Sequence, residues 1–148
     1  MKIIQLSQGE RASSGFTHKA NISYANGDFS EAATTQTYTL ASLAVGDLVR
    51  NCALRKVTDL SGGSVSAAVA LVGKTGTTNA YCTSSNVFTS STVYYKAGDG
   101  ASFNQAGGEV HIATSALIVT ITTTTANVST LTAGEIDVYF SICTLSNL

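Results

Sequence analysis

The chain has 148 residues, of which 44% are hydrophobic and 11% are charged, and its formal net charge is −1. This length suits one domain with a genuine core, while ordinary soluble domains carry roughly 25% charged residues. The sequence contains no run of like charges, so it lacks the basic footprint expected of a protein that binds nucleic acid or an anionic membrane. An uncharged exterior rich in Ser and Thr instead fits a protein that packs against other proteins.

The first segment, residues 1–16, has the pattern of an extended N-terminal arm. A short apolar stretch at residues 3–6 is followed at once by Ser, Gly and charged residues. That stretch is too short for the apolar core of a signal peptide. We expect the arm to pair with a neighbouring sheet or subunit, and residues 17–148 to form a single domain.

The middle of the chain reads as short strands separated by turns. Alternation of polar and apolar residues and β-branched content predict strands at 17–24, 34–40, 48–57, 65–72 and 92–96, and the Ala content of 65–72 leaves a helix as the alternative there. Asn26-Gly-Asp28 predicts a turn, and so does Gly98-Asp-Gly100. Residues 73–79 are expected to form a loop, and residues 81–88 a short helix or an irregular excursion.

The C-terminal part carries the strongest pattern. One face of an extended segment is apolar and the other polar; the two sets are Ile136, Val138, Phe140 and Ile142, and Glu135, Asp137, Tyr139 and Ser141. Such period-2 alternation is typical of a half-buried strand. A second run rich in β-branched residues spans 116–125, and residues 126–130 supply a turn. The pair predicts an antiparallel hairpin.

About eight short strands with turn signals between them, and no helix predicted with certainty, indicate an all-β fold. We predict an antiparallel β-sandwich of about eight strands, jelly-roll-like, with an extended N-terminal arm.

The sequence offers no catalytic or cofactor motif. His18 and His111 stand apart from other metal-type ligands, and the three cysteines, Cys52, Cys82 and Cys143, lack metal-like spacing. Buried thiols in a reducing cytosol, or one disulfide plus a free thiol, both fit them. Glu135 and Asp137 share one strand face, about 7 Å apart. We interpret that face as solvent- or subunit-facing, and predict no enzyme activity, no metal and no cofactor.

Four stretches in order resemble small virion proteins encoded beside the capsid genes of tailed bacteriophages. They are Met1-Lys-Ile-Ile-Gln-Leu-Ser-Gln-Gly-Glu10, Val49-Arg-Asn-Cys-Ala-Leu-Arg-Lys-Val-Thr58, Leu71-Val-Gly73 and Leu131-Thr-Ala-Gly-Glu-Ile-Asp-Val-Tyr-Phe140. The resemblance implies a capsid decoration, or cement, protein. Such proteins are often jelly-roll-like homotrimers that bind the major capsid protein on the outer surface of the shell.

From this resemblance we expect a virion protein, made in the host bacterial cytoplasm, that stabilises the shell. The candidate capsid or subunit contacts are the apolar residues of the arm, namely Ile3, Ile4, Leu6 and Phe16. The competing hypothesis is a carbohydrate-binding or fibre domain of a virion. Its sugar platforms would be Tyr81, Tyr94, Tyr95 and Tyr139.

Overall fold

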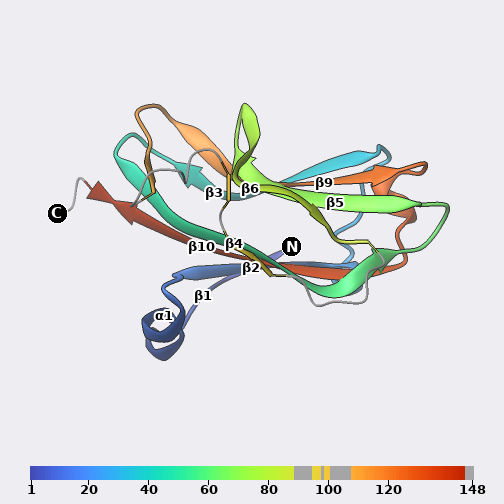
Figure 1. Cartoon of the computed structure of the whole chain (residues 1–148), viewed down its shortest axis with the longest axis horizontal. Helices are drawn as coiled ribbons and strands as arrows, with labels where there is room; N and C mark the ends of the chain where they lie inside the picture. The colour runs from blue at the N-terminus through green and yellow to red at the C-terminus, as the bar shows by residue number, and fades with distance from the viewer. Residues whose placement is uncertain (89–94, 98, 101–107, 146–148) are drawn as a thin grey trace.

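Two antiparallel sheets face each other and enclose the core, as Figure 1 shows for the computed structural model. The structure describes residues 1–88, 95–97, 99–100 and 108–145. The first sheet, here sheet A, runs in the order β1 (Lys2–Gln5), β2 (His18–Ser23), β10 (Ala133–Thr144), β4 (Asp47–Ser61) and β7 (Tyr95–Ala97), and β8 (Glu109–Val110) also pairs with β4. The second, sheet B, runs in the order β3 (Thr35–Leu43), β9 (Ser115–Thr124), β5 (Ala67–Lys74) and β6 (Thr77–Asn86).

The path of the chain between the sheets is that of a jelly roll. The chain passes from one sheet to the other after β2, β3, β4, β6, β8 and β9. The strand order β2-β10-β4-β7 therefore faces the order β3-β9-β5-β6, which is the double-sheet winding of jelly rolls. The prediction of an all-β antiparallel sandwich is confirmed.

The predicted C-terminal hairpin is wrong, although its two strands exist. β9 lies in sheet B between β3 and β5, and β10 lies in sheet A between β2 and β4. The short 3-10 helix Val128–Thr130 carries the chain across, with Val128 buried. Both strands have an apolar face, and these faces meet across the core instead of lying edge to edge. The inward residues are Leu117, Val119 and Ile121 from β9 and Ile136, Val138 and Phe140 from β10.

The core between the sheets consists of side chains that point inward from both sheets. Tyr81, Phe140, Ile22, Leu43 and Leu54 are among the largest that are almost fully buried. Burying one such side chain contributes about 1.5–3 kcal/mol relative to leaving it in water. The apolar face predicted for β10 is therefore the inner face of a central strand.

Residues 1–16 fold onto the same chain. β1 pairs antiparallel with β2, from Lys2 opposite Asn21 to Gln5 opposite His18. A helix that the sequence analysis did not predict, α1 (Gln8–Ser14), follows and buries none of its residues. Its sequence signal is the capping box formed by Ser7 and Glu10, in which each side chain accepts from the other residue's backbone N–H.

The predicted helix or excursion at residues 81–88 is also wrong, because most of this segment belongs to β6 and its continuation. Ala80, Tyr81 and Cys82 are all fully buried, and pairing between β5 and β6 shifts register on both sides of Val72. Consecutive burial hides the alternation by which a strand is recognised. The expected loop at 73–79 shrinks to the turn between Lys74 and Thr77.

Several expected elements are confirmed within small shifts of their ends. β2, β3, β4 and β5 cover the strands expected at 17–24, 34–40, 48–57 and 65–72. The turn at Asn26-Gly-Asp28 follows the 3-10 helix Tyr24–Asn26, with Gly27 in the left-handed region at φ 69°. Of the strand expected at 92–96, residues 92–94 lie outside the described residues, as does Gly98 of the expected turn.

Candidate functional site

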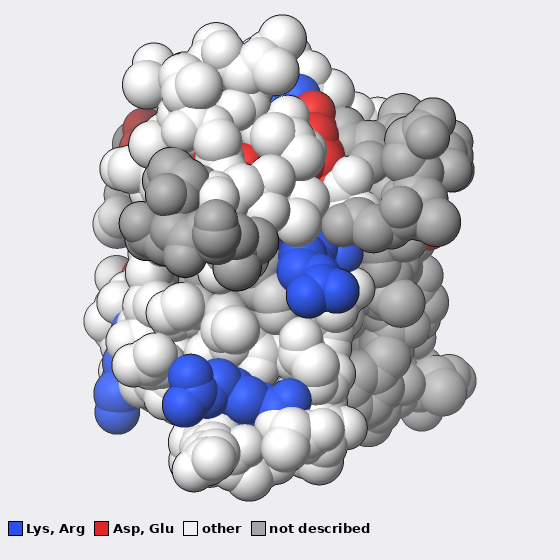
Figure 2. All heavy atoms as spheres, turned by 90° about the vertical axis from the view of Figure 1, so that its left-hand side faces the viewer, with Lys and Arg blue, Asp and Glu red and all other residues white. Residues whose placement is uncertain are grey.

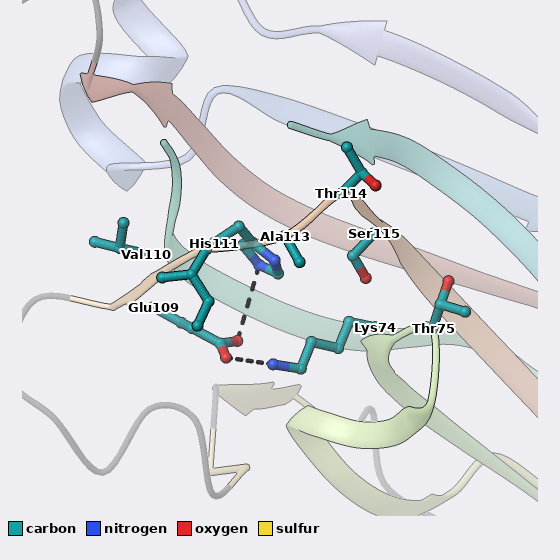
Figure 3. Close-up of a pocket in the computed structure, with 9 residues that line it drawn as sticks. Lys74, Thr75, Glu109, Val110, His111, Ala113, Thr114 and Ser115 are labelled. Atoms are coloured by element: carbon teal, nitrogen blue, oxygen red, sulfur yellow. Dashed lines mark hydrogen bonds and ion pairs between the residues drawn. The ribbon is translucent and has the colours of Figure 1, made fainter. Parts of the chain in front are cut away.

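A hollow of about 380 Å³ opens at one end of the sandwich. Three segments line it: the end of β5 with its turn, β8, and the connection that leads into β9. The lining residues are Lys74, Thr75, Glu109, Val110, His111, Ile112, Ala113, Thr114 and Ser115. Figure 3 shows Lys74 and His111 directed toward Glu109 from two sides.

Glu109 is the centre of a network that joins the two sheets. Its Oε1 pairs with the Lys74 ammonium, and its Oε2 accepts from the Tyr81 hydroxyl at 2.8 Å. The Tyr81 oxygen also lies 2.8 Å from Nε2 of His111. Lys74 and Tyr81 belong to strands of sheet B, whereas Glu109 belongs to β8 of sheet A. The network therefore connects the two sheets through side-chain hydrogen bonds and an ion pair at this end.

The phenol of Tyr81 fixes the proton on His111. A phenol has one hydroxyl proton, and here it is donated to Glu109. The Tyr81 oxygen then accepts from Nε2–H of His111. Burial lowers the pKa of His111 below its usual 6.5, although Glu109 acts in the opposite direction. The neutral imidazole with a proton on Nε2 is thus the form that this site favours.

The pKa values of Glu109 and Tyr81 shift in opposite directions. Burial acts to raise the pKa of Glu109, but hydrogen bonds from Lys74 and Tyr81 outweigh it, and the pKa lies below the usual 4.5. Burial, followed by the hydrogen bond to Glu109, raises the pKa of Tyr81 well above 10. The network therefore holds one carboxylate, one ammonium and two neutral rings.

The backbone fixes the position of this network. His111 N donates to Asp47 O at 2.7 Å, and Gly46 N donates to His111 O at 2.8 Å. Gly108, at φ 98°, passes so close to β4 that an added Cβ would lie 2.2 Å from Val49 O. Only glycine fits such an approach, and it brings the following Glu109 onto β4.

An apolar rim stands beside the hollow. Val45, Val110 and Ile112 are 62%, 47% and 90% exposed. Among the described residues, Figure 2 shows mostly uncharged side chains at the end of the molecule that carries the turn between β3 and β4, with a few Lys or Arg and Asp or Glu side chains. The hollow thus combines a closed polar network with aliphatic side chains and Thr and Ser hydroxyls. This end can hold an uncharged partner surface or a small polar ligand.

A second polar cluster covers the outer face of sheet A. Asn21 Nδ2 donates to Glu135 Oε1 at 2.7 Å and to Asp137 Oδ1 at 2.9 Å. Lys19 Nζ lies 2.8 Å from Asp137 Oδ2. Glu135 and Asp137 share a strand face as predicted, but Asp137 is only 1% exposed. The ion pair of Lys19 with Asp137 and the Asn21 amide that bridges the two carboxylates make this a structural cluster on a strand face.

The predicted contact residues of the arm separate into two groups. Ile3 and Ile4 are each 41% exposed on the outer strand of sheet A. Leu6 differs from the expectation, because it is 6% exposed and its N–H donates to Thr17 O at 2.9 Å. Phe16 is half-buried, with its ring 5.7 Å from that of Tyr139. Leu6 is thus buried within this chain, whereas Ile3 and Ile4 are both exposed.

The tyrosines proposed as sugar platforms do not form one surface. Tyr81 is fully buried, which contradicts its use as an exposed platform. Tyr139 is half-buried between Phe16 and Lys19, whose Nζ lies 5.7 Å from its ring centroid. Tyr94 and the side chain of Tyr95 lie outside the described residues.

The sequence analysis did not predict the hollow at the end of the sandwich, because its lining residues come from three separate segments of the chain.

Comparison with protein-family models, with curated proteins and with solved structures gave no match to this chain. Within the described residues, no group of three or more His, Cys, Asp or Glu side chains is placed to hold a metal ion. In the same part of the chain, no helix has the length and apolar character needed to cross a membrane.

Proposed function

We propose that this chain is a bacteriophage capsid decoration protein, a non-enzymatic cement that binds the outer surface of the shell as a homotrimer. The family resemblance of the sequence supports this function, and the jelly-roll sandwich agrees with it. The major capsid protein is the proposed partner, and the capsid surface in the virion is the proposed location.

The observation that carries the proposal is the placement of the exposed apolar side chains. Among the described residues they gather mainly in two places. One is the outer strand of sheet A, with Met1, Ile3 and Ile4, and the other is the rim formed by Val45, Val110 and Ile112. A protein that bridges neighbouring molecules needs two contact surfaces of this kind, one for its own copies and one for the shell.

Physical chemistry explains how such a small domain can stabilise a shell. A thin shell is under pressure from packaged DNA, and each bound copy buries additional apolar area at about 25 cal/mol per Å². A trimer that contacts several shell subunits at once binds by avidity, since the later contacts form at high effective concentration. Many individually weak contacts then give tight binding of the trimer to the shell.

The first experiment counts the copies of this protein in purified virions by quantitative mass spectrometry. We expect copies on the order of hundreds, in simple ratio to the major capsid protein, since multivalent bracing requires occupancy of repeated positions. A handful of copies would instead indicate a tail or fibre component. Absence from the virion would overturn the proposal.

A second experiment tests the outer strand of sheet A as the contact with the shell or a neighbouring subunit. We expect the double change Ile3→Ser and Ile4→Ser to weaken binding to shells that lack this protein at least about tenfold, because each Ile loses about 1–2 kcal/mol of burial. Tyr24→Ser, which removes an exposed apolar side chain outside both patches, serves as the control. Equal binding by the wild type and the double variant, at unchanged melting temperature, would contradict this assignment.

The alternative function is a carbohydrate-binding or fibre domain of the virion. The observation that favours it is the hollow, where Thr75, Thr114 and Ser115 offer hydroxyls beside the aliphatic Val110 and Ile112. A glycan array separates the two functions. Specific glycan binding that is lost in Thr114→Ala would support this alternative. Binding to shells, together with no glycan binding on the array, would support the decoration protein.

A further inference from the structure

The outer edges of the two sheets differ in how they are protected from pairing with another chain. An edge strand exposes unpaired N–H and C=O groups, and proteins usually protect it by making it short, by placing charges on it, or by covering it. In sheet A the edge strands β1 and β7 have only four and three residues. In sheet B the edge strand β6 is partly covered, since Gly100 N donates to Tyr81 O at 3.0 Å. These edges therefore carry the usual protection.

The opposite edge of sheet B, strand β3, lacks this protection. β3 has nine residues, and none of them is charged or is proline. Its backbone pairs with β9 on one side, and on the other side no backbone hydrogen bond joins it to another described segment. The connection from β2 contacts the Gln36 side chain instead, where Oε1 accepts from Ser30 N at 3.2 Å and Nε2 donates to Asp28 O at 2.8 Å. The free edge of β3 is thus open to a further strand.

The side chains of β3 suit pairing with a second copy of the same strand. Thr35, Thr37 and Thr39 are exposed on the outer face, whereas Tyr38 is buried on the inner face. Threonine opposite threonine is a favourable cross-strand pair, and the strand already uses it, since Thr35 Oγ1 lies 3.3 Å from Thr122 Oγ1 of β9. A second copy offers the same alternation, and because β3 has no charge the two strands do not repel each other. A charged strand of another protein would find no opposite charge here.

We propose that β3 pairs antiparallel with β3 of a second copy, so that the two B sheets form one continuous sheet across a two-fold axis. The regular pairing of β3 ends at a register shift between Thr39 and Ala41. The regular stretch before it, Thr35–Thr39, is centred on Thr37. The register that pairs this whole stretch places Thr37 opposite Thr37 of the second copy, and Thr35 opposite Thr39. This inference does not depend on the proposed function, and the two-fold contact would link copies of neighbouring trimers.

The size of this contact makes the association weak and dependent on concentration. A pairing of this length buries much less area than the roughly 1,600 Å² of a standard protein–protein interface. We therefore expect separate copies to pair only at high protein concentration. Copies held side by side on a common surface would pair more readily, because their effective concentration is higher.

The first test places single cysteines on β3 of the full chain, in a Cys143→Ala background that removes the half-buried thiol. Directly opposed residues of antiparallel strands have Cα atoms about 4.5–5.5 Å apart, which is within the range of a disulfide. We expect Thr37→Cys to form a disulfide-linked dimer under mild oxidation with oxidised glutathione, seen in the mass of the non-reduced protein. Thr35→Cys is the matched control, because it is also exposed but would lie about 13 Å along the strand from its own copy. It should cross-link at least about tenfold more slowly, and equal rates would overturn the proposed pairing.

The second test needs no cross-link. In sedimentation equilibrium of the wild type, the mass of the smallest species should double as the protein concentration rises. Thr37→Lys should weaken this association at least about tenfold, because it places two like charges opposite each other at the centre of the contact. Thr124→Lys, exposed at the end of the neighbouring strand β9, is the matched control and should leave the association unchanged. A mass that stays constant at all concentrations, or an equal effect of the two lysines, would overturn the inference.

Discussion

The two sheets share one core, yet their outer faces are stabilised in different ways. The outer face of sheet A carries charged groups, with Lys19 paired to Asp137 at 2.8 Å. The outer face of sheet B carries hydroxyl pairs, with Thr37 Oγ1 and Thr120 Oγ1 3.3 Å apart across neighbouring strands. Both central strands bury polar side chains, since Asp137 is 1% and Thr120 5% exposed. Sheet A therefore satisfies its buried polar side chain with a charged partner, whereas sheet B does so with a neutral hydroxyl.

The difference shows what each face can tolerate. A buried carboxylate is stable only while its partners remain, because losing them leaves an uncompensated charge. A pair of threonines can lose both hydroxyls at little cost, because two apolar groups of similar shape can replace both partners of a hydrogen bond. Sheet A should thus be sensitive to single changes on its outer face, and sheet B should tolerate them.

The largest expected effect is on sheet A. Asp137→Ala should lower the free energy of unfolding by about 3 kcal/mol, because it leaves the Lys19 ammonium and the Asn21 amide without their buried acceptor. Urea denaturation measures this loss. Glu135→Ala on the same face is the matched control and should cost about 1 kcal/mol or less, since Glu135 is half-buried. Equal costs for the two variants would remove the distinction between the faces.

The network at the end of the sandwich involves both sheets, and the pH dependence of the free energy of unfolding tests its contribution to stability. The folded pKa of His111 is lowered, so the unfolded chain takes up a proton first as the pH falls below about 6.5. Stability should therefore decrease on acidification from neutral pH, with a slope of at most about 1.4 kcal/mol per pH unit from this one group.

Denaturation at several pH values between neutral and acidic measures this slope. His111→Gln should make the decrease between pH 6.5 and pH 5 shallower, while His18, whose pKa burial also lowers, keeps its own share. The lowered pKa of Glu109 adds a loss at lower pH, as its carboxylate takes up a proton. An unchanged slope in His111→Gln would show that the network does not couple folding to pH.

The smallest expected effect is on sheet B. Thr37→Val and Thr120→Val should each change the free energy of unfolding by less than about 1 kcal/mol, with a coupling of about 0.5 kcal/mol between them. A double-mutant cycle measures the coupling. Thr39→Val with Thr122→Val is the control, because these residues face different partners, Ile118 and Thr35, and should be additive. A coupling as large as the Asp137 effect would erase the contrast between the sheets.

The sequence by itself determined the class of fold and the inward face of strands with clear alternation, such as β10. The alternation in β10 identifies which of its residues face the core, because successive side chains of a strand point to opposite faces. The same local logic predicted the turn at Gly27 and strands β2 to β5. It also contained the signal for α1, since the Ser7 and Glu10 capping box depends only on neighbouring residues.

Only the tertiary structure decided which strands lie side by side and which side chains meet. Periodicity says that β9 and β10 each have an apolar face, but it cannot say whether those faces share one sheet or oppose each other across the core. The network of Lys74, Tyr81, Glu109 and His111 depends on crossings between the sheets. Those crossings minimise the exposed apolar area of the whole chain, a quantity that no local segment records.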